Sequence, residues 1–171
     1  MGEKQKYIVK TIAYDGLLNY RELFRILDVW LREKFYDKKE KRNEQYMTAE
    51  GMNIETEFIP WKKVTDYFKI MIKIEITGTG LKEVEVELHG KKTKMHQGKV
   101  SIKITGYLVV DYEVLGVSQW SKPVLYFLRD IFDKYVYWRI TKKYIEMTLD
   151  DVDSLYNHLR AYLNMEQYKV G

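Results

Sequence analysis

The sequence predicts an α+β protein in which an antiparallel sheet of about five strands packs against helices. Residues 64–77 and 99–108 alternate apolar and polar side chains, which is typical of antiparallel strands with one buried and one solvated face. Residues 20–31 and 148–163 instead repeat apolar side chains at helical spacing. A broader apolar arc over residues 123–140 predicts a long helix that is buried on more than one side. We therefore expect a sheet packed against one long helix of the C-terminal part, with two other helices.

The N-terminal part of the chain predicts a strand followed by a capped helix. Residues 6–14 are rich in β-branched and aromatic side chains and end at the turn signal Asp15-Gly16. Asn19 is then a suitable N-cap, and Glu22 three residues later completes a capping box. The helix is expected to begin directly after this cap.

The middle of the chain is predicted to be rich in strands. Residues 37–51 show no periodicity and are expected to form an irregular, solvated connection. Residues 53–60 alternate and end at a proline, which favours a strand end. Gly78-Thr79-Gly80 predicts a turn between two strands, and residues 90–99 predict a basic loop after a strand that ends at Leu88.

Two helix starts are predicted in the last third of the chain. Ser121 is a suitable N-cap with Pro123 close to the first helical position. Thr148 with Asp151 resembles a second N-terminal box. The aspartates of residues 150–153 fit this interpretation, because anions stabilise the N-terminus of a helix.

Composition limits the possible classes of protein. The 171 residues suit a single domain spanning residues 1–171, and 46% hydrophobic residues suffice for a core. The absence of cysteine excludes disulfides, a thiol nucleophile and a cysteine-rich zinc site. No apolar run is long enough to span a bilayer and no secretory signal is recognised, so we expect a cytoplasmic protein. The absence of cysteine and the abundance of lysine, glutamate and isoleucine are typical of thermophiles.

No motif for catalysis, a cofactor or a metal is found in the sequence. The chain has no G-x-S-x-G, P-loop or dinucleotide-binding fingerprint. The carboxylates of Glu83, Glu85 and Glu87 fall on a strand face predicted to be wet, where they suit cross-strand ion pairs with lysines. His89 and His96 lie close together, but two ligands are too few for a typical zinc site. We therefore predict a non-catalytic protein without metal or cofactor.

A ligand pocket is the leading functional hypothesis. The element order resembles the helix-grip arrangement, in which a helix closes a curved sheet around an apolar cavity, although that arrangement lacks the additional last helix predicted here. The resemblance implies a pocket between sheet and long helix. The residues expected to line it are Phe127, Tyr135, Trp138, Ile72 and Ile74. The alternative is that these side chains fill a dry core.

Binding of single-stranded nucleic acid is the second functional hypothesis. Lysines that meet phosphates beside aromatic rings that stack on bases form such surfaces. The candidate residues are Lys91, Lys92, Lys94, Lys99, Trp61, Tyr67 and Tyr107. Glutamates on the same predicted face and a net charge of only +4 argue against this hypothesis.

Self-association or docking to a protein partner is a third hypothesis. Tyr137, Trp138 and Tyr144 are predicted to lie outside the main buried arc of the long helix. Tyrosine and tryptophan are enriched at protein interfaces, so these residues suit an interface, including one between copies of this chain.

The general residue pattern over residues 60–137 resembles that of a group of known sequences. The stretches TDYFKIMIKIEITG, GYLVVDYE and PVLYFLRDIFDKY are similar to those of small uncharacterised archaeal proteins. The resemblance implies a shared fold family and a thermophilic, intracellular setting, and it implies no activity.

Overall fold

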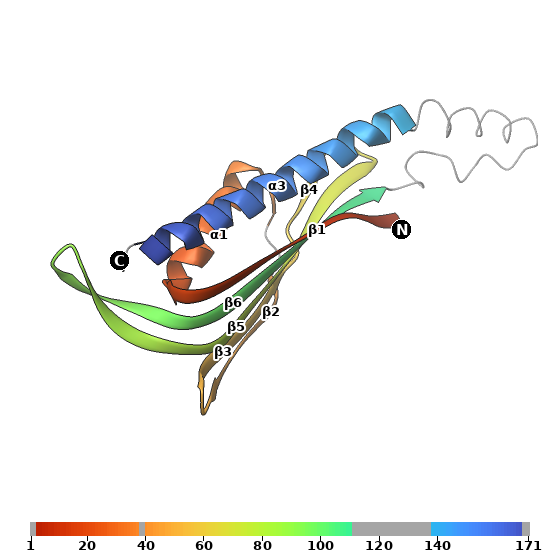
Figure 1. Cartoon of the computed structure of the whole chain (residues 1–171). Coiled ribbons are helices and arrows are strands. Elements are labelled where there is room, and N and C mark those ends of the chain that lie inside the picture. The colour runs from red at the N-terminus through yellow and green to blue at the C-terminus, as the bar shows by residue number, and fades with distance from the viewer. Residues whose placement is uncertain (1–2, 38–39, 111–137, 169–171) are drawn as a thin grey trace, which may run out of the picture.

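The computed structural model describes residues 3–37, 40–110 and 138–168, which form a curved sheet with two helices on one of its faces (Figure 1). Its elements are β1 (Glu3–Leu18), α1 (Tyr20–Glu33), β2 (Glu40–Thr48), β3 (Gly51–Phe58), β4 (Trp61–Lys63), β5 (Phe68–Leu88), β6 (Lys91–Val110) and α3 (Trp138–Tyr168). The predicted α+β class is confirmed, with six strands in place of about five. Most of the helix predicted over residues 121–140 lies outside the described residues.

All pairs of neighbouring strands in the described sheet are antiparallel. The strand order is β1-β6-β5-β3-β2, and β4 also pairs with β5. The first strand thus lies beside the last described strand, and the remaining strands follow as a meander. Helix α3 runs across the sheet with α1 beside it (Figure 1).

The core lies between the sheet and these two helices. The period-two alternation predicted for residues 64–77 is confirmed from Phe68 onward, because Ile70, Ile72, Ile74 and Ile76 are all buried on β5. Residues 64–67 form bends before this strand. Helix α1 contributes leucines at helical spacing, and α3 contributes a second apolar stripe. The buried helical side chains include Leu23, Leu27, Leu31, Val152, Leu155 and Leu159.

Helix α1 begins and ends with recognisable caps. The Asn19 side chain accepts a hydrogen bond from the backbone N–H of Glu22 at 3.3 Å, which confirms the predicted N-cap. At the other end, Tyr36 N–H donates to the Leu31 carbonyl at 2.8 Å and Phe35 N–H to the Arg32 carbonyl at 3.1 Å. This is the Schellman pattern, and it places Phe35 at a φ of 60°, where glycine is preferred.

Two predicted interruptions of the N-terminal half are wrong. Strand β1 continues through Asp15-Gly16 to Leu18, because β6 pairs with it along this whole stretch. The predicted connection over residues 37–51 contains β2, which pairs with β3. Strand β2 lies at the edge of the sheet with exposed side chains wherever these are described, so it needs no apolar alternation.

The hairpin of β5 and β6 also differs from the prediction. Gly78-Thr79-Gly80 does not form a turn but lies in a 21-residue strand, where the register shifts between Thr79 and Lys82. Glycine suits such a bulge as well as it suits a turn. The predicted basic loop over residues 90–99 is wrong as well, because His89 and Gly90, both with positive φ, form a two-residue turn and β6 begins at Lys91.

The predicted helix start at Thr148 is wrong. Thr148 lies inside α3, which in the described residues begins at Trp138, and its hydroxyl donates to the Tyr144 carbonyl at 2.8 Å. This bond to a carbonyl four residues earlier is the usual alternative role of threonine within a helix. Asp151 therefore lies in the middle of a helix and not at an N-terminus.

Candidate functional site

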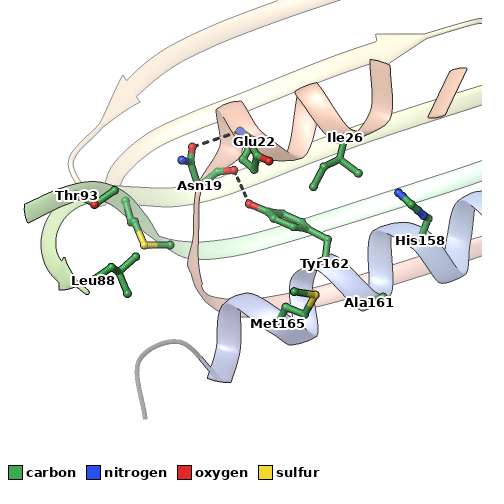
Figure 2. Close-up of a pocket in the computed structure, with 10 residues that line it drawn as sticks. Asn19, Glu22, Ile26, Leu88, Thr93, His158, Ala161, Tyr162 and Met165 are labelled. Atoms are coloured by element: carbon green, nitrogen blue, oxygen red, sulfur yellow. Dashed lines mark hydrogen bonds between the residues drawn. The ribbon is translucent and has the colours of Figure 1, made fainter. Parts of the chain in front are cut away.

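A pocket of about 510 Å³ opens where α1, α3 and the β5–β6 hairpin meet (Figure 2). The N-cap and first turns of α1 form one wall, the last turns of α3 form another, and the hairpin closes a third side. The lining residues are Asn19, Glu22, Ile26, Leu88, Thr93, Met95, His158, Ala161, Tyr162 and Met165. Its volume lies within the range of sites for small organic molecules.

The lining is mainly apolar, and its side chains range from buried to exposed. Met95 on β6 is 1% exposed, whereas Met165 on the last turns of α3 is 61% exposed. Ile26 and Leu88 are half-buried between these extremes. Methionine side chains adapt to irregular shapes, so this wall suits an apolar group without a fixed outline.

The polar residues of the pocket are held by bonds to neighbouring groups. The Tyr162 hydroxyl donates to the Asn19 carbonyl at 2.9 Å and so ties α3 to the start of α1 (Figure 2). The Glu22 carboxylate binds the Arg25 guanidinium through both of its oxygens, with Nε at 2.8 Å from Oε2. This hydrogen bond raises the pKa of Arg25, and it leaves the Glu22 charge compensated.

The hairpin presents alternate side chains of β6 to the pocket. Thr93 and Met95 line it, and Lys91 precedes them by two and four residues on the same strand. Lys91 lies directly opposite Leu88, which also lines the pocket. Side chains of directly opposed residues share one face of a hairpin, so Lys91 belongs to the face that carries the lining residues.

The structure places the predicted pocket residues elsewhere or outside its described ranges. Ile72 and Ile74 are fully buried in the core cluster and do not line the pocket at the hairpin. Trp138 is 60% exposed and lies twenty residues before His158 on α3, which corresponds to roughly 30 Å of helix. Phe127 and Tyr135 lie outside the described residues.

The predicted nucleic-acid residues form two separate groups. Trp61 and Tyr107 both pair with Met71 from opposite sides, so these rings lie on neighbouring strands. Lys94 lies thirteen residues before Tyr107 on the same strand, a path of roughly 43 Å at the usual strand rise. The structure therefore does not bring the lysines near the turn together with the aromatic group.

The remaining members of that set fall between or beside the two groups. Lys91 and Lys92 directly follow the hairpin turn, Lys99 lies opposite both Asp15 and Thr79, and Tyr67 is half-exposed before β5. Cations already occupy the aromatic group, since Lys4 Nζ lies 3.9 Å from the centre of the Tyr107 ring. These positions form no continuous track for a phosphate backbone.

Ion pairs occupy the wet face of the sheet, as the sequence predicted. Lys73 Nζ lies 2.9 Å from Glu75 and 3.6 Å from Glu57, and Lys103 Nζ lies 3.8 Å from Glu75. Near the hairpin turn, Lys94 Nζ lies 2.8 Å from Glu83. The hydrogen bond with Glu83 raises the pKa of Lys94, so this lysine already has a carboxylate partner on the hairpin.

A buried charged cluster is the main feature that the sequence did not reveal. Asp151 on α3 is 5% exposed and binds Lys62 Nζ of β4, and it accepts a hydrogen bond from the Tyr36 hydroxyl at 2.8 Å. Lys34 Nζ lies 3.8 Å from Oδ1 of the same carboxylate. The pKa of Tyr36 is raised, mainly because its hydroxyl is buried and secondly because the Asp151 charge lies beside it. The cluster joins α3 to β4 and to the end of α1, and none of the four residues lines the pocket at the hairpin.

The two histidines that were considered as a metal pair, His89 and His96, lie in different surroundings. His89 lies in the hairpin turn, whereas the His96 ring packs against the Tyr20 ring with 4.6 Å between the ring centres. The described residues hold no group of three potential metal ligands. Among the helices of the described part of the chain, none is both long and apolar enough to cross a membrane.

Self-association stays a prediction. Of the aromatic residues expected at an interface, Tyr144 packs against Phe68 with 4.8 Å between the ring centres, and Tyr137 lies outside the described ranges.

Comparisons with known proteins place the chain in no group. No protein-family model, no curated protein and no solved structure matches it. The resemblance to archaeal proteins therefore stays a prediction.

Proposed function

We propose that this protein binds a small, largely apolar molecule in the pocket between α1, α3 and the β5–β6 hairpin, and that it acts without catalysis. The observation that carries the proposal is a pocket of about 510 Å³ whose wall is built mainly from Ile26, Leu88, Met95, Ala161 and Met165. Removing the apolar surface of a ligand from water supplies the driving force in such a site.

The topology supports a binding role of the helix-grip type. Strand β1 lies beside β6, the other strands follow as a meander, and the long α3 crosses the sheet. The pocket lies at the end of this arrangement and not in its centre, where Ile72 and Ile74 fill the core. Single-strand binding has less support, because the lysines near the hairpin turn and the aromatic rings lie far apart.

Filling the pocket tests the proposal. Ala161 lines the pocket on an exposed surface of α3, so Ala161→Trp places a large ring inside it without disturbing the core. Asn164→Trp adds the same ring on an exposed position of the same helix that does not line the pocket. The measurement is a titration with a neutral apolar fluorophore, N-phenyl-1-naphthylamine, at constant protein concentration.

The proposal predicts saturable binding to the wild type and to Asn164→Trp, and an affinity at least tenfold lower for Ala161→Trp. Thermal denaturation of all three proteins checks that the fold is retained. Equal affinities for the two tryptophan variants, or no saturable binding to the wild type, would contradict the proposal.

A further inference from the structure

We infer that the natural ligand is an anionic amphiphile, with its aliphatic part in the pocket and a carboxylate at Lys91. The inference rests on the proposed function and adds the chemical class of the ligand. It depends on the sequence of side chains that the hairpin presents, from the buried Met95 through the half-buried Thr93 to the exposed Lys91.

The register of the hairpin places Lys91 at the outer end of the pocket wall. Residues 91, 93 and 95 share one face of β6, because successive side chains of a strand point to opposite sides. Leu88 lies directly opposite Lys91, and it lines the pocket together with Thr93 and Met95. The same wall is therefore apolar inside and ends in an ammonium group outside.

The charge of Lys91 is available to a ligand. Within the described residues Lys91 makes no ion pair, whereas Lys94 is paired with Glu83. The next lysine, Lys92, lies opposite Glu87 on the other face of the hairpin. Lys91 is thus the hairpin lysine that lies both on the pocket face and without a carboxylate partner in the described structure.

The one carboxylate in the pocket lining, that of Glu22, does not reverse the preference for an anionic head group. Glu22 is bound through both carboxylate oxygens by Arg25, so its charge is compensated before a ligand enters. The lining holds no second carboxylate, because its remaining polar side chains are those of Asn19, Thr93, His158 and Tyr162. An anionic head group at the mouth therefore gains an attractive contact, and an ammonium head group meets like charge.

Three ligands with the same tail separate the effect of the head group from that of the tail. Octanoate, 1-octanol and octylamine each carry eight carbons, and calorimetric titrations of the 171-residue protein compare their affinities. The variant Lys91→Gln removes the proposed partner of the carboxylate, and Lys92→Gln removes the neighbouring charge from the opposite face as a matched control.

The inference predicts that octanoate binds more tightly than octanol, and octanol more tightly than octylamine. Lys91→Gln should weaken octanoate binding by roughly two- to fivefold, as expected for an exposed charge pair, and leave octanol unchanged. Lys92→Gln should leave both affinities unchanged. Raising the salt concentration should weaken octanoate binding to the wild type, with no such effect in Lys91→Gln.

Two results would overturn the inference while the proposed function stands: equal binding of octanoate and octanol, or equal losses in Lys91→Gln and Lys92→Gln. The second result would mean a general effect of positive charge and no specific contact. If none of the three ligands bound at all, the proposed function itself would fail.

Discussion

We expect Asp151 to contribute more to stability than most single side chains, because its carboxylate is buried together with the groups that it binds. The Lys62 side chain is 16% exposed, and its Nζ lies 4.5 Å from the centre of the Tyr36 ring. The Tyr36 ring in turn stacks on Trp30, with 5.8 Å between the ring centres. Removing one partner of such a cluster leaves the other charge buried without compensation. The cost therefore exceeds the value of the lost contact alone.

The variant Asp151→Asn should lower the free energy of unfolding by about 3 kcal/mol, measured by urea denaturation. Lys34→Gln serves as the matched control, because the Lys34 side chain is 43% exposed and its Nζ lies 3.8 Å from the same carboxylate. This exposed pair should contribute less than about 1 kcal/mol. Similar losses in both variants would show that burial of the charge is not the cause.

His96 makes the stability of the hairpin depend on pH. Burial is the main cause that lowers the pKa of its imidazole; Glu83 opposes this effect, and Arg21 adds to it. Its Nδ1 is buried without a hydrogen-bond partner in the described structure. Because the pKa is lower in the folded state, the unfolded chain binds the proton more tightly, and stability falls as pH drops below the ordinary value of 6.5.

The variant His96→Gln should lose less stability than the wild type between pH 7.5 and pH 5, measured by urea denaturation at each pH. His158→Gln is the control, because it removes an exposed imidazole and leaves His96 in place. Its pH dependence should follow that of the wild type. An unchanged pH dependence in His96→Gln would contradict the assignment.

At the scale of single elements, the contact between α3 and β6 depends on Gly106. A methyl group at this position would lie 2.8 Å from methyl carbons of Ile8 and Val152 and 3.0 Å from that of Thr148. All three neighbours are β-branched and therefore stiff, and Val152 and Thr148 are fully buried. The helix can approach the sheet here only because the strand has no side chain.

Gly106→Ala should therefore destabilise the protein by about 2 kcal/mol, because it overpacks this contact. Ser101→Ala on the same strand is the control, since Ser101 is exposed and should change stability by less than about 0.5 kcal/mol. Thermal or urea denaturation measures both. A neutral Gly106→Ala variant would mean that α3 does not lie this close to β6.

Elements with a local signal were predictable from the sequence. The cap at Asn19 depends on residues within one turn, and the buried isoleucines of β5 depend on a simple alternation, so both predictions are confirmed. Strand β2 has no such signal, because it is an edge strand whose described side chains are exposed on both faces. Its formation depends on the partner strand β3, which a local pattern does not reveal.

Glycine and threonine signals were ambiguous because these residues serve more than one structure. Gly80 forms a bulge inside β5 where a turn was expected, and Thr148 bonds backward inside α3 where a cap was expected. In both cases the pairing or packing of distant segments decides between the two roles. The same reason explains why Asp151, assigned to a helix N-terminus, belongs to a buried cluster.

At the scale of the whole molecule, the pocket is a product of topology. Its walls come from three segments, near residues 19–26, 88–95 and 158–165, and no short motif marks any of them. A sequence can predict that a sheet and a long helix enclose something, as the helix-grip resemblance did. It does not decide whether the buried isoleucines leave a central cavity or fill the core, and it gives no sign that the pocket lies at the hairpin end.

The most direct test of this account is an NMR titration that follows the methyl groups of the seven methionines with 1-octanol as ligand. The account predicts saturable shifts for Met95 and Met165, which line the pocket, and none for Met47, which is exposed on the edge strand β2. Shifts centred on Met47 or Met71, or no shift for Met95 at saturation, would contradict binding in this pocket.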